Sequence, residues 1–385
     1  MNSKAFREQI RDWLQDNFPA PAEGSEQNEE DAKLWLDRLI GKGWTAPGWP
    51  TAYGGGGLDD SQHRILLQEM AAIGASVPAG GMGMGLIGPT LLEFGTEEQK
   101  QRHLTRIVRR EVRWCQGYSE PGAGSDLAGL TTRAEDTGDY FLVNGQKTWT
   151  SGANLADWIF ALVRTDPDVP KHDGISFVLM DMHQPGITVR PIRLISGASP
   201  FCDTFFDDAV AQKEDLVGKL NQGWTVGKRL LQHERSSGLR VTAGAGASRR
   251  KSGDPMGELA KKYLGETEGK ISEPAIRDMV LKHRMKQRSL QLTQARAREE
   301  NQSGRVPAET TSIFKLVGST LTRENADLQT RLMGFQGFGW DGDQFSEEER
   351  TATRSWLRSR AVTIYGGTNE VQMNIISKRV LGLPD

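Results

Sequence analysis

The sequence predicts an α+β chain: an N-terminal helical domain, a central antiparallel β-barrel or sandwich domain, and a C-terminal helical bundle. Apolar residues follow a helical period up to about residue 112, strand-like segments follow one another over 113–214, and the helical period returns afterwards. We therefore predict domains at 1–112, 113–214 and 215–385. A chain of 385 residues is also too long for one simple core.

The N-terminal region is typical of amphipathic helices. Phe6, Ile10, Trp13 and Leu14 fall at offsets 0, 4, 7 and 8, which places them on one helical face. The stretch APGWPTAYGGGG (46–57) is rich in Pro and Gly and predicts a loop between helices.

One glycine pattern in this region invites a second interpretation. Gly83, Gly85 and Gly88 spell G-x-G-x-x-G, which marks a dinucleotide-binding loop when it follows a strand. Because the preceding segment looks helical, we expect a close helix contact or a loop here.

The central region switches to strand signals. Asn144-Gly145 lies between two runs of β-prone residues, which predicts a hairpin turn at this dipeptide. Segments such as WIFALVR, ISFVLMD and ITVRPI follow at short spacings, and they predict a compact sheet domain.

The C-terminal region predicts long helices and two loops. A buried stripe at offsets 0, 3, 4, 7, 14 and 21 is formed by Ile276, Met279, Val280, His283, Leu290 and Ala297. The polar stretch 248–258 is expected to be a loop, and the acidic stretch 341–352 is expected to lead from a loop into a helix.

The composition excludes several classes of protein. With 48 basic and 50 acidic residues the net charge is −2, which argues against a nucleic-acid partner. Cys115 and Cys202 are isolated, so we expect neither a disulfide framework nor a metal site. No apolar run approaches the ~20 residues of a membrane span. The acidic, amphipathic N-terminal segment is a poor targeting peptide, and we expect a cytoplasmic protein without a membrane partner.

The stretch YSEPGAGSD (118–126) opens the sheet region. Its Pro and Gly residues favour a sharp turn with exposed backbone N–H groups, which suits an anionic or polar ligand edge. Taken alone, the stretch is better explained by a tight surface turn.

Three segments in order change this interpretation. YSEPGAGSD, NGQKTWTSGA (144–153) and YGGTNEVQ (365–372) resemble the acyl-CoA dehydrogenase family over essentially the whole chain. The resemblance implies an FAD-dependent oxidoreductase that converts an acyl-CoA thioester to the trans-2-enoyl-CoA. It also implies a role in acyl-CoA catabolism, electron-transfer flavoprotein as acceptor, and a homo-oligomer, dimer or tetramer.

The same resemblance implies which residues contact the cofactor. Trp149 and Ser151 are expected to contact the isoalloxazine ring, and an indole offers a broad, rigid face for it. The full set of expected FAD contacts is Tyr118, Ser119, Gly124, Ser125, Trp149, Ser151, Thr368 and Glu370.

A catalytic carboxylate often precedes the Gly-Thr of the last segment in this family, and here the position holds Gly366. By this resemblance, Gly366 keeps the backbone N–H that stabilises the thioester oxygen in the family. It has no side chain that could act as the base. Glu234-Arg235 matches the branch that includes isovaleryl-CoA and long-chain acyl-CoA dehydrogenases, whose base lies on the helix after the sheet. We predict Glu234 and Gly366 as catalytic residues and Ser125, Arg235 and Gly366 as substrate contacts. Spacing alone favours the interpretation of Glu234 as a surface carboxylate, solvated or paired with Arg235 or Arg240, because most Glu residues lie at the surface.

The chain also departs from the family pattern. An Arg-x-x-Phe-Gly stretch that grips FAD across a subunit interface is replaced by the polar region 249–274, and Arg331 and Phe335 stand where Gln and Gly are commoner. Three hypotheses remain open: an active dehydrogenase using Glu234, a non-catalytic or half-site partner subunit of a hetero-oligomer, and a flavin monooxygenase relative. The acyl chain is not identified by the sequence.

Overall fold

The computed structural model describes residues 3–21, 28–244, 254–301 and 310–384, with the side chains of 234–244, 298 and 301 left out. Two compact units make up the chain. Unit 1 comprises 1–192 with 200–249, and unit 2 comprises 193–199 with 250–385. Each unit is described by itself below.

Unit 1 begins with the expected helices. They are α1 (Ser3–Asn17), α2 (Glu29–Gly41), α3 (Asp60–Ala72), α4 (Gly88–Phe94) and α5 (Glu97–Val108). The side chains of Phe6, Ile10 and Leu14 are buried on α1 as the periodicity predicted. Asp59 and Thr96 form capping boxes that satisfy free N–H groups where α3 and α5 begin.

The three glycines of the G-x-G-x-x-G pattern occupy a π-helical turn, η2 (Gly83–Ile87), and the first residue of α4. The preceding element is helix α3, so this is no dinucleotide loop. A Cβ on Gly88 would lie 2.0 Å from the Trp49 ring, and one on Gly83 would lie 3.2 Å from Ile107. Close packing therefore explains Gly83 and Gly88, as expected.

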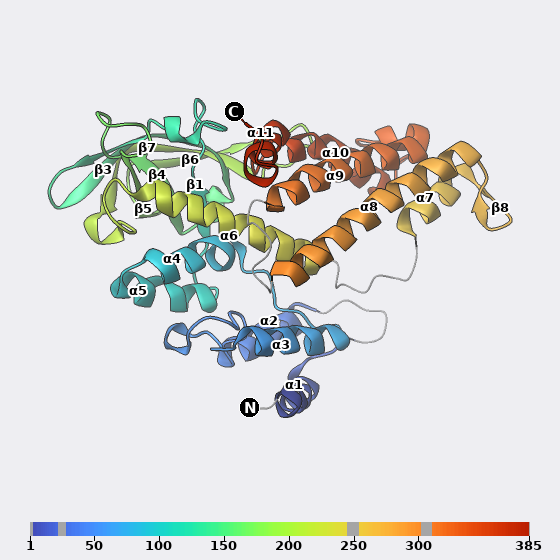
Figure 1. Ribbon diagram of the computed structural model, residues 1–385, viewed down its shortest axis with the longest axis horizontal. Helices are drawn as coiled ribbons and strands as arrows, with labels where there is room; N and C mark the ends of the chain where they lie inside the picture. The colour runs from blue at the N-terminus through green and yellow to red at the C-terminus, as the bar shows by residue number, and fades with distance from the viewer. Residues whose placement is uncertain (1–2, 22–27, 245–253, 302–309, 385) are drawn as a thin grey trace. The chain divides into compact units, whose positions relative to one another are not determined.

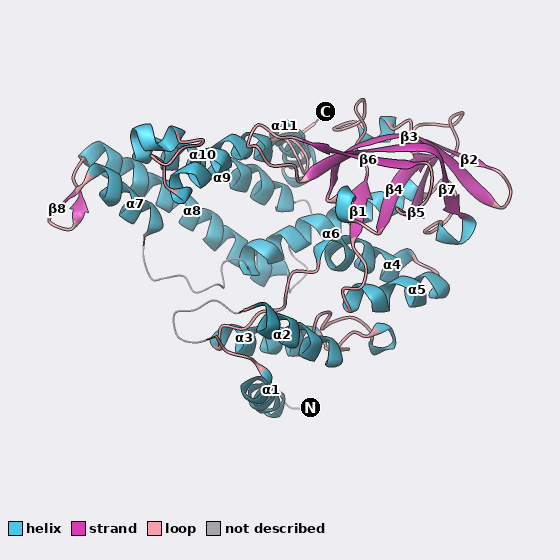
Figure 2. Cartoon of the chain, turned by 180° about the vertical axis from the view of Figure 1, so that it is seen from behind, coloured by secondary structure: helices cyan, strands magenta, loops and turns pink. Residues whose placement is uncertain are grey.

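The central domain of unit 1 is a curled, mixed sheet (Figure 2). Its strands are β1 (Trp114–Gly117), β2 (Arg133–Asp136), β3 (Tyr140–Ser151), β4 (Trp158–Arg164), β5 (Ile175–Asp181), β6 (Ile187–Ile192) and β7 (Phe201–Gln212). Strand order is β1-β4-β2-β3-β7-β6, with β5 beside β4. Most pairs are antiparallel, and β4 makes parallel pairs with β1 and β2.

The predicted hairpin turn at Asn144-Gly145 is wrong. Both residues lie inside the single strand β3, where the pairing with β7 shifts register between Val143 and Gly145. The Asn144 side chain accepts a hydrogen bond from the backbone N–H of Asp208 and donates one to its carboxylate. The dipeptide therefore forms an irregularity that is stabilised by the neighbouring strand, which local sequence does not reveal.

Strand β4 is buried on both faces, which explains its continuous apolar sequence. Phe160 and Leu162 pack into one core, and Ile159 and Ala161 pack into another. The first core extends to Val226 and Leu230 of α6 (Gly223–Gly244), which contacts β5 and β4 (Figure 1). Helix α6 thus begins against the sheet.

Unit 2 is a helical bundle with a small hairpin. Its elements are α7 (Pro255–Leu264), β8 (Glu266–Thr267), β9 (Lys270–Ile271), α8 (Pro274–Asn301), α9 (Thr311–Met333), α10 (Glu347–Ser359) and α11 (Asn369–Ile375). Helix α9 contacts α7, α8, α10 and α11. Ile276, Val280 and His283 are buried along α8 as predicted. The stretch 341–352 leads into α10, whose first turn is capped by Ser346.

Part of the expected loop at 248–258 lies outside the described residues, and Pro255 within it begins helix α7. Unit 1 therefore contains helices followed by a sheet, and unit 2 contains helices, which confirms the predicted fold class. The domain boundaries stay predictions. Among the described residues, no helix combines the length and the apolar character needed to cross a bilayer.

Candidate active site

Trp149 sits on a bulge of β3. Two β3 residues, Thr148 and Trp149, oppose one residue of β7 between the pairs Lys147–Thr204 and Thr150–Cys202. Trp149 has φ +59°, an uncommon value for a bulky residue, and its side chain is 54% exposed. Bulges often re-aim a side chain beside a functional site. Here the bulge leaves a large indole exposed between the buried residues Lys147 and Thr150.

The turn at 118–126 lies against this bulge. The N–H of Thr148 donates to the carbonyl of Ser119 at 2.8 Å, and Glu120 and Ala123 exchange two backbone hydrogen bonds of 3.0 Å. Ser125 is exposed, and a Cβ on Gly124 would meet open space. Within the described residues, no acceptor pairs with the N–H of Gly124 or Ser125. These groups remain available to a ligand.

Tyr118 lies differently from the other residues of this turn. Its ring is buried, edge-on to Phe160 and Phe177. A contact of Tyr118 with a ligand would therefore come from its backbone. Ser151 is half-buried and pairs with Phe201 of β7.

A buried ion pair joins the two segments. Lys147 Nζ lies 2.7 Å from Glu120 Oε1, and the side chains are 0% and 5% exposed. Burial raises the pKa of Glu120, but the charge and hydrogen bonds of Lys147 outweigh this effect and hold the pKa at about 2. Burial lowers the pKa of Lys147 to about 8, partly offset by Glu120. Both groups are therefore charged between about pH 2 and 8.

Unit 2 brings Gly366, Thr368 and Glu370 together in one turn. Gly366 and Gly367 have φ +66° and +87°, values that favour glycine. Gly366 is exposed, and no acceptor among the described residues pairs with its N–H. The Thr368 hydroxyl accepts from the N–H of Val371 and so caps α11. The Gly366 backbone therefore offers a free donor.

Lys315 of α9 lies beside this turn. Its Nζ donates to the carbonyl of Val362 at 2.8 Å, and a Cβ on Gly366 would lie 3.5 Å from its Cε. Burial lowers the pKa of Lys315. Ser319, one helical turn further, donates to the side chain of Asn369 at 2.9 Å. Helix α9 therefore supports the turn at two points.

The predicted base, Glu234, lies on helix α6. Glu234 and Arg235 fall within α6, but their side chains lie outside the described part of the chain.

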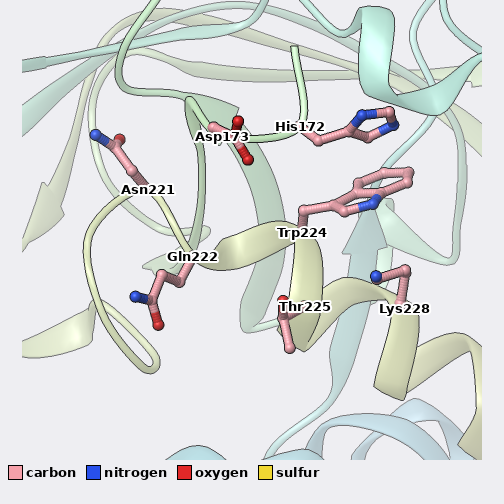
Figure 3. A pocket seen from close by; sticks show the side chains of 7 residues that line it. All are labelled: His172, Asp173, Asn221, Gln222, Trp224, Thr225 and Lys228. Atoms are coloured by element: carbon pink, nitrogen blue, oxygen red, sulfur yellow. The ribbon is translucent and has the colours of Figure 1, made fainter. Parts of the chain in front are cut away.

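A pocket that sequence reasoning missed lies where α6 begins (Figure 3). Its volume is about 520 Å³, and its lining residues are His172, Asp173, Asn221, Gln222, Trp224, Thr225 and Lys228. The His172 and Trp224 rings lie side by side with centroids 4.9 Å apart. Lys171, next in the chain, pairs with Asp126 at 2.8 Å, which connects this pocket to the 118–126 turn. No local sequence signal marks these residues, because the loop that holds His172 and Asp173 and the first turn of α6 come together only in the folded chain.

Comparison with protein-family models identifies the family of this chain. Models of the acyl-CoA dehydrogenase N-terminal, middle and C-terminal domains match residues 2–111, 115–209 and 221–381. The chain therefore belongs to the acyl-CoA dehydrogenase family, a family of oxidoreductases that generally bind FAD.

Individual relatives are similar to this chain along nearly its full length. The chain is 37% identical over 388 residues to the acyl-CoA dehydrogenase IpdE1 of Mycobacterium tuberculosis, covering 98% of this chain and 97% of that protein. It is similar to the solved Tcur3481-Tcur3483 steroid ACAD, with a TM-score of 0.75, 28% identity and coverage of 99% and 97%. It is also similar to the ChsE4-ChsE5 complex from M. tuberculosis, with a TM-score of 0.71, 27% identity and coverage of 100% and 98%.

Proposed function

We propose that this chain is an FAD-dependent acyl-CoA dehydrogenase that converts an acyl-CoA thioester to the trans-2-enoyl-CoA, with Glu234 as base. The observation that carries the proposal is the bulge that exposes Trp149 and that is hydrogen-bonded, through Thr148, to the turn carrying the free N–H groups of Gly124 and Ser125. An exposed aromatic face next to unpaired donors fits a flavin, whose ring is apolar on its faces and polar at its edges.

The resemblance to the family names the residues that would hold FAD. Trp149 and Ser151 would contact the ring system, the 119–125 turn would donate hydrogen bonds, and Thr368 and Glu370 would approach the nucleotide. FAD supplies, when bound, the acceptor for the hydride that leaves the β-carbon of the substrate.

The chain's own residues perform the proton chemistry in this proposal. The Glu234 carboxylate takes the α-proton of the thioester as a general base. The N–H of Gly366 donates a hydrogen bond to the thioester oxygen, where negative charge develops during the reaction. Arg235 and Ser125 would contact the substrate.

The pocket where α6 begins is suited to the nucleotide end of coenzyme A. The His172 and Trp224 rings, tilted by 48° with centroids 4.9 Å apart, offer an aromatic surface for an adenine, and Lys228 offers a positive charge for a phosphate. Because Lys171 links this pocket to Asp126, a CoA chain starting here would run toward Ser125.

A partner-subunit role is the second candidate. Two similar structures carry two-component names, and the stretch that grips FAD between subunits is replaced in this chain. In that case the chain would bind FAD and substrate only together with a homologous subunit. A homodimer or homotetramer, electron-transfer flavoprotein as acceptor and a cytoplasmic location belong to the first candidate.

The visible spectrum of the purified protein tests the proposal. Flavin absorbance that bleaches anaerobically on addition of straight-chain, branched or ring-bearing acyl-CoA thioesters supports a dehydrogenase. A colourless protein that acquires flavin only when a homologous subunit is co-expressed supports the partner role. A protein that acquires no flavin in either form contradicts both.

A further inference from the structure

Both members of the buried Glu120–Lys147 ion pair make further hydrogen bonds. Glu120 Oε2 accepts from the N–H and the hydroxyl of Thr131 at 2.7 and 2.9 Å, and Oε1 accepts from the N–H of Thr132 at 2.9 Å. Lys147 Nζ also donates to the carbonyl of Tyr118 at 3.2 Å. A charge-assisted network of this kind has one preferred geometry.

The pair connects the two segments that offer the exposed indole and the free donors. Glu120 belongs to the 118–126 turn, and its backbone bonds with Ala123 close the turn just before Gly124. Lys147 is the last residue of β3 in regular register before the bulge that carries Trp149. The ion pair, together with the hydrogen bond from the N–H of Thr148 to the carbonyl of Ser119, therefore joins the turn to the bulge.

Stability does not by itself explain a charged pair here. A well-packed apolar pair of similar volume is often as stable as a buried ion pair, since burial removes both charges from water. What the ion pair adds is a fixed distance and direction between two backbone segments.

We propose that Glu120 and Lys147 are positioning residues for FAD, which hold the 119–125 turn and the Trp149 bulge at the spacing where both contact one flavin. This inference depends on the proposed function, because it requires that the chain binds FAD.

FAD affinity, separated from folding stability, tests the inference. Apo-protein is titrated with FAD by fluorescence quenching, and the Tm of each apo-protein is measured in parallel. The double variant Glu120→Gln/Lys147→Met keeps the volume of the pair without its charges. We expect its Tm to stay within a few degrees of the parent value and its Kd for FAD to rise at least tenfold.

Glu69→Gln is the matched control. Glu69 is a buried carboxylate, 6% exposed, that pairs with Arg7 and Arg11 between α1 and α3. Its replacement is expected to lower the Tm and leave the Kd for FAD unchanged. A rise in Kd that merely followed lost stability would appear in both variants.

Thr131→Val provides a milder test if the double variant does not fold. It removes only the hydroxyl bond to Glu120 from an exposed position, so the fold is preserved. We expect the Kd for FAD to rise several-fold. FAD binding by either folded variant with the parent affinity would overturn the inference, whereas a parent protein that binds no FAD would overturn the proposed function as well.

Discussion

The Nζ atom of Lys315 donates a hydrogen bond of 2.8 Å to the carbonyl oxygen of Val362, four residues before Gly366. Lys315 thus connects α9 to the turn that presents the free N–H of Gly366. Because that N–H is proposed to stabilise the thioester oxygen, its direction should matter more for the rate than for binding.

Lys315→Met is expected to lower kcat by about tenfold, which corresponds to the ~1.4 kcal/mol of a weakened charged hydrogen bond. The measurement is the anaerobic bleaching rate at saturating acyl-CoA. Lys286→Met is the control, since Lys286 pairs with the carboxylate of Glu324 in an exposed ion pair between α8 and α9. An equal loss in both variants would count against a role for the turn.

Glu234→Gln is expected to keep the visible flavin absorbance and to lose about 10²–10⁴-fold in turnover, the usual contribution of a general base. Single-turnover kinetics measure the effect. Glu348→Gln removes an exposed carboxylate paired with Lys262 and should leave turnover unchanged. Near-parent turnover in Glu234→Gln would assign the base to another residue.

Trp149→Gly separates the cofactor role of Trp149 from a structural role. Glycine tolerates the positive φ at this bulge, which costs an L-residue about 1–2 kcal/mol, so the Tm should not fall. FAD affinity should drop by roughly tenfold with the loss of the aromatic face. Trp149→Phe is the comparison, because it keeps an aromatic ring and should recover part of the affinity. An unchanged Kd for FAD in the glycine variant would remove Trp149 from the site.

Acid stability should depend on Glu120. Its pKa is about 2 in the folded chain, below the 4.5 of the unfolded chain, so its contribution to the free energy of unfolding is present above pH 4.5. That contribution, on the order of 3 kcal/mol, is lost as the pH falls from 4.5 toward 2. Urea unfolding across this range should show a steeper loss for the parent protein than for Glu120→Gln. Parallel curves would indicate that the ion pair does not persist in solution.

Lys228→Glu tests the coenzyme A pocket. Reversal of the charge should raise KM for acyl-CoA by about tenfold and leave kcat nearly unchanged, because the nucleotide end is remote from the reacting carbons. Lys219→Glu makes the same change of charge at an exposed residue outside the pocket lining and should leave KM unaltered. Equal effects of both variants would indicate general electrostatic attraction instead of a site.

Local patterns in the sequence were enough to predict the order of the helical and strand regions along the chain. The stripe on α8, the capping residue Ser346 before α10 and the apolar run of β4 depend on periodicity and on nearest neighbours, which are written directly into the sequence. Family resemblance added the segments that contain Trp149, Glu234 and Gly366.

The continuity of β3 through Asn144-Gly145 was not predictable in this way. Asn144-Gly145 carries a strong turn signal, yet hydrogen bonds between Asn144 and Asp208 keep the strand continuous. Such a pairing joins residues 64 positions apart, and no local preference reports it.

The sequence by itself determined the family, the fold class and the residue types available for flavin chemistry. Only the tertiary structure decided which of them meet: Lys147 with Glu120, Lys315 with Val362, and His172 with Trp224. The physical reason is that each contact joins elements distant in the chain, and its energy exists only once folding has brought the two partners together.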